Sequence, residues 1–115
     1  RVPAGKTSIS SIKAFYFDAS TSVKDLNLKF TTSRITSGAA HTTDTTETYT
    51  TYATVGTQNS LQSISATAAS YNAISTVAAG DIINVYLYRD SHFVSGSADS
   101  YDANWDLVGI ECVFN

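Results

Sequence analysis

Alternation of apolar and polar residues over positions 23–30, strict from position 25 on, is the feature that most constrains this chain. A period of two is that of a β-strand with one face in the core and one in water, whereas an amphipathic helix repeats every three to four residues. We therefore predict a half-buried antiparallel strand here. Its inward residues are Leu26, Leu28 and Phe30, and its outward residues are Asp25, Asn27 and Lys29.

Similar but weaker patterns predict further short strands along the first half of the chain. Over residues 8–18, one face carries Ile9, Phe15 and Phe17, and the other carries Ile12, Ala14 and Tyr16. From residue 31 to 46 the apolar signal fades, and residues 37–44 are expected to form a long exposed loop. Alternation resumes weakly over residues 49–55, before a turn at 56–60.

Residues 61–79 are open to two interpretations. The segment 61–68 fits another strand, but the apolar residues also approximate a helical stripe that Gly80 would end. The many Ser and Thr residues lower helix propensity, which favours the strand. The stripe consists of Leu61, Ile64, Ala68, Tyr71, Ile74 and Ala78.

The last third contains two strands that are apolar on both faces. After a turn at residues 79–81, the strand 82–89 presents Ile83, Val85 and Leu87 on one face and Ile82, Tyr86 and Tyr88 on the other. A polar connection, 90–104, leads to a final strand, 105–115. That strand presents Val108, Ile110, Cys112 and Phe114 on one face and Leu107, Gly109, Glu111 and Val113 on the other. Such strands are too apolar for one wet face, so we expect a symmetric partner to cover the second face.

Composition supports one folded domain, 1–115, of the antiparallel β-sandwich class with jelly-roll topology and long Ser/Thr-rich loops. The 115 residues include 16 Ser and 16 Thr, yet 43% are hydrophobic and 11% aromatic, which excludes a disordered linker. Cys112 is the only cysteine, so no intrachain disulfide forms and stability is expected to come from association. Because the chain begins with Arg1 rather than Met, we expect a piece of a longer protein, whose preceding part stays open.

Charge and hydropathy bear on the partners. A net charge of −3 argues against nucleic acid and anionic membranes. No run approaches the roughly 18 apolar residues that a membrane-spanning helix needs, so we expect no membrane insertion.

Acidic residues gather late in the chain, at Asp90, Asp99, Asp102 and Asp106. Oxygen ligands at this density are compatible with Ca²⁺, but the spacing of a calcium-binding loop is missing. A turn in which Asp side chains hydrogen-bond their own backbone is the favoured interpretation, and calcium stays the alternative. His41, His92 and Cys112 do not supply a zinc site, so no metal or other cofactor is expected.

No pattern of a catalytic site is present. The chain has no Gly-x-Ser-x-Gly sequence, and nothing brings Asp44, Glu47 and Glu111 together as the paired carboxylates of a glycosidase. We therefore expect a protein that is not an enzyme.

Aromatic residues among hydroxyl and amide side chains indicate glycan recognition, because a ring offers a flat face to sugar C–H groups. The candidates for such a site are Tyr101, Trp105, Tyr49 and Tyr52. The competing interpretation is that these residues belong to the core or to a subunit interface. Residues near His41 form the next candidate loop.

Three segments carry a resemblance to a known group of proteins. They are the runs 79–89 (AGDIINVYLYR), 99–102 (DSYD) and 107–114 (LVGIECVF). This ending resembles the C-terminal head domains of bacteriophage tail-fibre, tailspike and capsid-associated proteins. Those heads are homotrimeric jelly rolls, similar to the heads of tumour necrosis factor and complement C1q.

The resemblance implies several roles for residues of this chain. Arg89 would form a structural ion pair with Asp99 or Asp102, while Ile82, Tyr86 and Tyr88 would form the trimer interface around the threefold axis. The domain would be the trimerisation and receptor-binding head of a fibre or spike on the virion, with bacterial surface polysaccharide as its receptor. Tail and capsid locations remain open.

Two other functions stay open. One is a monomeric carbohydrate-binding module of a secreted, extracellular protein, which the aromatic and hydroxyl residues would also suit. The other is a trimeric capsid decoration protein, which sequence alone does not separate from a fibre head.

Overall fold

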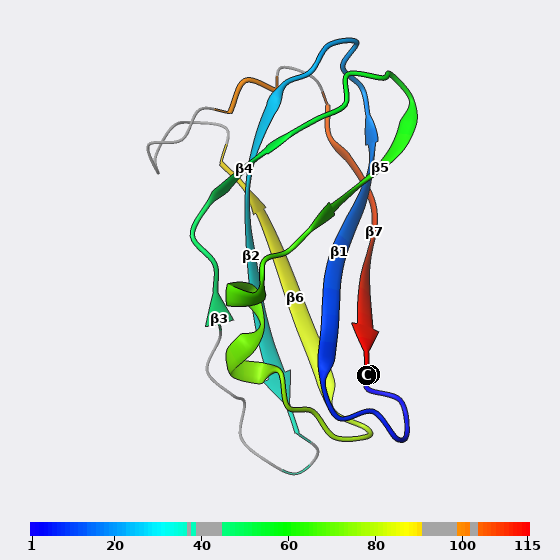
Figure 1. The fold of residues 1–115 in the computed structure, drawn as a ribbon, viewed down its shortest axis with the longest axis vertical. Helices are drawn as coiled ribbons and strands as arrows, with labels where there is room; N and C mark the ends of the chain where they lie inside the picture. The colour runs from blue at the N-terminus through cyan, green and yellow to red at the C-terminus, as the bar shows by residue number, and fades with distance from the viewer. Residues whose placement is uncertain (37, 39–44, 91–98, 102–103) are drawn as a thin grey trace.

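The computed structural model describes residues 1–36, 38, 45–90, 99–101 and 104–115. It is an all-β sandwich of two antiparallel sheets, about 46 × 28 × 18 Å overall (Figure 1). This confirms the predicted all-β antiparallel sandwich, while the jelly-roll topology stays a prediction. One sheet has the order β5-β1-β7, formed by β5 (Ser60–Ser65), β1 (Ile9–Asp18) and β7 (Asp106–Phe114). In the other, β2 (Asp25–Ile35) is central, with β6 (Ile82–Arg89) on one side and the short β3 (Thr45–Thr46) and β4 (Thr50–Ala53) on the other.

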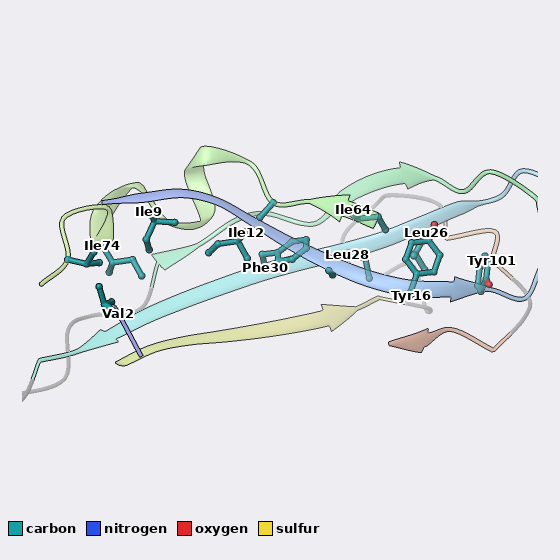
Figure 2. Packing of buried hydrophobic residues seen from close by; sticks show 13 residues of the cluster. Val2, Ile9, Ile12, Tyr16, Leu26, Leu28, Phe30, Ile64, Ile74 and Tyr101 are labelled. Carbon is teal, nitrogen blue, oxygen red and sulfur yellow. The ribbon is translucent and has the colours of Figure 1, made fainter. Parts of the chain in front are cut away.

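The core lies between the two central strands, β1 and β2. The inward residues predicted for β2 are all fully buried, and they pack against one face of β1 (Figure 2). Alternation therefore identified the core side of β2 correctly. Of the two faces predicted for β1, the one that carries Ile12, Ala14 and Tyr16 is buried. The six side chains are Leu26, Leu28 and Phe30 from β2 and Ile12, Ala14 and Tyr16 from β1.

One residue of β2 that was expected to face water is buried instead. Asn27 has no exposed surface, and both of its backbone polar groups are hydrogen-bonded to residues that come after β6. Its carbonyl accepts the N–H of Asp90 at 3.0 Å, and its own N–H donates to Asp99 Oδ2 at 3.3 Å. Asp90 and Asp99 thus satisfy the backbone of a position that the sequence assigned to solvent.

Strand β2 also runs further than its apolar pattern. Residues 31–33 belong to it and are buried, although the sequence predicts that the apolar signal fades there. Hydroxyl groups replace apolar contacts: Thr32 Oγ1 lies 2.8 Å from Thr45 Oγ1 and also donates to the Ser70 carbonyl. Of the predicted loop 37–44, only Gly38 lies among the described residues.

The ambiguous segment 61–79 is a strand followed by two short turns of helix. β5 takes its first part, and the 3₁₀ helices η1 (Ala68–Ser70) and η2 (Asn72–Ile74) follow. The strand interpretation is correct for residues 61–65. No continuous helix forms in this segment, and Ile74 enters the core from η2.

Strands β6 and β7 lie in different sheets but on the same side of the sandwich (Figures 1 and 2). Each pairs with one central strand, and among the described residues its other edge has no strand partner. The inward side chains of the central strands are fully buried, whereas those of β6 and β7 are only partly buried. We call this the open side of the sandwich, defined by the partly covered inward side chains Ile83, Val85, Leu87, Cys112 and Phe114 and by the exposed Ile110 beside them.

A tight approach at one end of the sandwich requires glycine. Gly56 has φ +67°, and a Cβ there would lie 2.5 Å from backbone atoms of Ser22 and Val23. Gly5 has a similar φ of +76°, but a Cβ there would meet nothing within 4 Å. An alanine would strain the backbone at both positions but would clash only at Gly56. Comparing the two substitutions therefore separates the two contributions to the free energy of unfolding.

We expect Gly56→Ala to destabilise the protein far more than Gly5→Ala. The left-handed conformation costs about 1–2 kcal/mol at both positions, and the backbone clash adds about 1–3 kcal/mol at Gly56 alone. Urea unfolding at one fixed protein concentration measures both changes. Equal losses for the two variants would contradict the close packing of residues 22–23 against Gly56.

Candidate functional site

Arg89, the last residue of β6, forms a two-point ion pair with Asp99. Its Nε lies 2.9 Å from Oδ2 and its Nη2 lies 3.1 Å from Oδ1, and the Asp99 side chain is almost fully buried. This is one of the two pairings that the sequence led us to expect. Asp102, the other expected partner, lies outside the described residues.

Asp99 is fully engaged in holding the chain. Besides Arg89, its Oδ1 accepts the N–H of Tyr101 at 2.9 Å and its Oδ2 accepts that of Asn27. Arg89 Nη2 also donates to the Tyr101 carbonyl, and its guanidinium lies 5.3 Å from the Tyr101 ring centroid. Asp99 is therefore a structural anchor rather than an open cation ligand.

The calcium alternative finds no donor set in the described part of the chain. No group of three His, Cys, Asp or Glu side chains gathers there. Asp99 behaves as the turn interpretation predicts, since its carboxylate accepts the backbone N–H two residues later. Asp106 instead begins β7 and is exposed.

Tyr101 was expected at the surface as a glycan-binding ring, and this prediction is wrong. The side chain is buried, and its hydroxyl donates to Asp18 Oδ1 at 3.2 Å while accepting the Ala19 N–H at 2.8 Å. Burial raises the pKa of the Tyr101 phenol, and the nearby Asp18 carboxylate adds to the effect. Tyr101 thus ties the connection before β7 to the end of β1.

Asp18 is the centre of what we call the polar end, the end of the sandwich where Asp18, Gly56 and Tyr101 meet. It is fully buried, and its Oδ1 also accepts the Ser20 N–H at 2.9 Å while Oδ2 accepts the Gly56 N–H at 3.0 Å. One carboxylate therefore holds three segments that are distant in sequence. The alternation over residues 8–18 gives no sign of this role.

Trp105 and Tyr52 are also packed against the core rather than displayed. Trp105 lies on Tyr16, with ring centroids 5.8 Å apart and planes tilted by 42°. The Trp105 Nε1 and the Tyr52 hydroxyl are buried without a hydrogen-bond partner among the described residues. Neither ring offers the free flat face that glycan binding was expected to use.

A buried carboxylate that the sequence placed in a loop proves to be a packing element. Glu47 accepts hydrogen bonds from Thr50 at 2.9 Å and Thr67 at 2.8 Å through Oε1, and from Ser70 at 2.5 Å through Oε2. It joins the β3–β4 segment to η1. Glu111 lies on the other sheet, so the two glutamates do not form a catalytic pair; Asp44 lies outside the described residues.

Tyr49 is the one predicted glycan residue that lies on an outer face. It meets Lys29, whose Nζ is 5.0 Å from the Tyr49 ring centroid and 4.7 Å from that of Tyr88. Tyr86 projects from the same face two residues before Tyr88. We call Lys29, Tyr49, Tyr86 and Tyr88 the tyrosine face; sequence reasoning assigned its members to separate roles and overlooked Lys29.

The residues expected at a trimer interface are well exposed on this outer face. Ile82, Tyr86 and Tyr88 have exposed fractions of 47%, 46% and 45%. A second exposed set lies on β7 at the open side, where Leu107, Val108 and Ile110 are 45%, 55% and 37% exposed. The molecule therefore offers two apolar surfaces with different chemistry.

Comparisons with known proteins identify no relative: no family model, curated protein or solved structure matches the chain. The described residues enclose no pocket. They include no helix long and apolar enough to cross a membrane.

Two tyrosines give the fold a defined alkaline limit. Burial raises the pKa of Tyr16 to about 12, with Asp18 and Tyr101 adding to it, and burial raises that of Tyr52 to about 12, with Glu47 adding to it. The unfolded chain ionises these phenols near pH 10, so their contribution to stability is full below pH 10 and is lost between about 10 and 12. We expect the unfolding midpoint to fall over this window.

Phenolate absorbance and urea unfolding from pH 9 to 12 measure this behaviour. Tyr16→Phe and Tyr52→Phe should each reduce the fall in stability between pH 10 and 12. Tyr88→Phe, at an exposed tyrosine, should leave this fall unchanged. A wild-type protein whose stability is constant across the window would contradict the burial of these phenols.

Removing the Asp99 carboxylate should destabilise the polar end. Asp99→Ala leaves Arg89 without its partner and frees two backbone N–H groups, so we expect a loss of about 3 kcal/mol or more. Asp106→Ala, at an exposed carboxylate, serves as the control and should change stability by less than about 0.5 kcal/mol. Similar urea midpoints for the two variants would contradict the anchor role.

Proposed function

We propose that this protein is a non-enzymatic, self-associating head domain that assembles as a homotrimer and binds polysaccharide on a bacterial surface. The observation that carries the proposal is the open side of the sandwich. There, both edge strands lack a strand partner among the described residues, and the inward side chains are only partly covered. A second copy is the economical cover for such a surface.

Strand β6 shows no sign of protection against pairing. It is eight residues long and pairs in continuous register with β2, without a bulge. It contains no Pro or Lys, the residues that commonly keep an edge strand from pairing with another chain. An edge of this kind suits association through backbone hydrogen bonds.

Strand β7 adds apolar area to the same side. Leu107, Val108 and Ile110 are exposed, and a register shift opposite Phe15 and Tyr16 bends the strand where they lie. Exposed aliphatic residues next to an incomplete core are typical of an obligate interface. We therefore place the subunit contact along the open side, and keep the face of Ile82, Tyr86 and Tyr88 as the second candidate.

The trimer, the jelly-roll topology and the virion location come from the resemblance of the chain's ending to phage fibre, spike and capsid-associated heads. The Arg89–Asp99 pair supports that resemblance, since it is the tie implied between the penultimate strand and its connection. A capsid decoration protein would share these features. Both would be virion proteins.

A monomeric carbohydrate-binding module of a secreted protein is the second candidate function. The tyrosine face favours it, because exposed rings beside a cation suit a wet binding surface. The two candidates differ in their oligomeric state and in what covers the open side.

Sedimentation equilibrium of the wild type and of Val108→Glu tests the proposal. We expect a trimer mass for the wild type at micromolar concentration. For Val108→Glu we expect the dissociation constant of the trimer to rise about tenfold or more, because a charge would be buried in the contact. Val55→Glu, at another exposed valine, is the control and should keep the trimer. A wild-type monomer whose stability does not depend on concentration would refute self-association.

A further inference from the structure

The tyrosine face combines flat aromatic rings with a fixed positive charge. We infer that it binds sugar units that carry a carboxylate, such as the uronic acids of an acidic polysaccharide. The inference rests on the binding half of the proposed function. It narrows the ligand to acidic sugars, and its site shares only Tyr49 with the aromatic residues predicted from the sequence.

Lys29 is held in place by the two rings that flank it. Its Nζ lies within 5.0 Å of the centroids of both Tyr49 and Tyr88, a distance at which the ring faces attract the ammonium group. No carboxylate among the described residues forms an ion pair with it. The charge is therefore positioned and available to an anionic ligand.

The strand register sets the spacing of the rings. Lys29 is opposite Tyr88 and Thr31 is opposite Tyr86, so both tyrosines project from the same face of β6. Two residues along a strand span roughly 7 Å, which lets each ring contact a different unit of one sugar chain. Thr31 is short and buried at this face, so the rings stand above it.

Charge selects the ligand class. The chain carries a net charge of −3, which opposes a general attraction to acidic polymers. Outward positions of β2 and β6 from Lys29 to Ile35 and from Ile82 to Tyr88 include no Asp or Glu, and the outward carboxylate of Asp25 lies four residues along β2, so Lys29 sets the charge beside the rings. A ligand that stacks on the tyrosines while its carboxylate meets Lys29 satisfies both features.

A second copy of the chain fits this face less well than it fits the open side. Closing it against another subunit would bury the Lys29 ammonium, and no carboxylate of the described part of the chain forms an ion pair with it to compensate. The open side offers aliphatic residues and strand edges instead. A trimer joined along the open side leaves one tyrosine face per subunit exposed, which raises the avidity for a repeating polymer.

Calorimetric titration of the whole chain with oligogalacturonate hexamers tests the inference, with neutral maltohexaose as the uncharged comparison. We expect the acidic hexamer to bind at least tenfold more tightly than the neutral one, and its affinity to fall as salt is raised. Lys29→Gln should weaken binding of the acidic hexamer about tenfold, whereas Lys29→Arg should retain it. Lys13→Gln, a matched change on the outer face of β1, should bind as the wild type does.

Ring variants separate stacking from charge. Tyr88→Ala should abolish binding of the acidic hexamer, and Tyr88→Phe should retain it, because the ring face and not the hydroxyl makes the contact. Urea unfolding of each variant verifies that the fold persists. Equal affinity for both hexamers, absence of any binding, or loss at Lys13→Gln as large as at Lys29→Gln would each overturn the inference.

Sedimentation of the same variants keeps this inference apart from self-association. A fall in mass for Tyr88→Ala would identify the tyrosine face as a subunit contact and overturn the inference, while self-association would stand. A wild-type monomer that binds the acidic hexamer through Lys29 and Tyr88 would refute self-association, while the inference about the ligand would stand. The two proposals can therefore fail separately.

Discussion

The core of this protein is centred on one strand pair, β1 and β2, and its other features follow from this constraint. Full burial is reached where β1 packs on β2, and the inward residues of β6 and β7 are already partly exposed. Each sheet has a single long central strand, so apolar packing closes the middle of the sandwich and the end where Val2 and Ile74 are buried, but not the opposite, polar end or the open side. Those regions have to be held by polar contacts or by another molecule.

At the polar end and beside β3, buried carboxylates replace apolar contacts. Asp18, Asp99 and Glu47 each accept several N–H or O–H donors from segments that are far apart in the chain. Hydrogen bonds to a charged acceptor are stronger than neutral ones, and one carboxylate can fix several loops at once. This is how a chain with so many Ser and Thr residues orders its connections without a disulfide: the hydroxyl and backbone donors surround a few buried acids.

Period-two alternation was sufficient to predict the all-β class and the core side of β2, because both depend on residues that are neighbours in sequence. It failed where burial depends on a distant partner. Thr32 is buried because Thr45 and Ser70 satisfy its hydroxyl, and Tyr101 is buried because Asp18, 83 positions away, accepts a hydrogen bond from its hydroxyl. An isolated aromatic or hydroxyl residue in a polar stretch carries no local sign of such a partner. Lys29 was overlooked for the same reason, since Tyr49 and Tyr88 meet it only across strands.

Strand β6 shows how one short segment can serve two surfaces at once. Its alternation sends Ile83, Val85 and Leu87 into the open side and Tyr86 and Tyr88 to the outer face, while its backbone edge stays available for pairing. Aliphatic residues and strand edges favour a permanent protein contact, whereas rings beside a lysine favour a hydrated, reversible one. Because the edge and the face point in different directions, occupying one does not block the other. A subunit built this way can assemble through β6 and still present the same strand to a ligand.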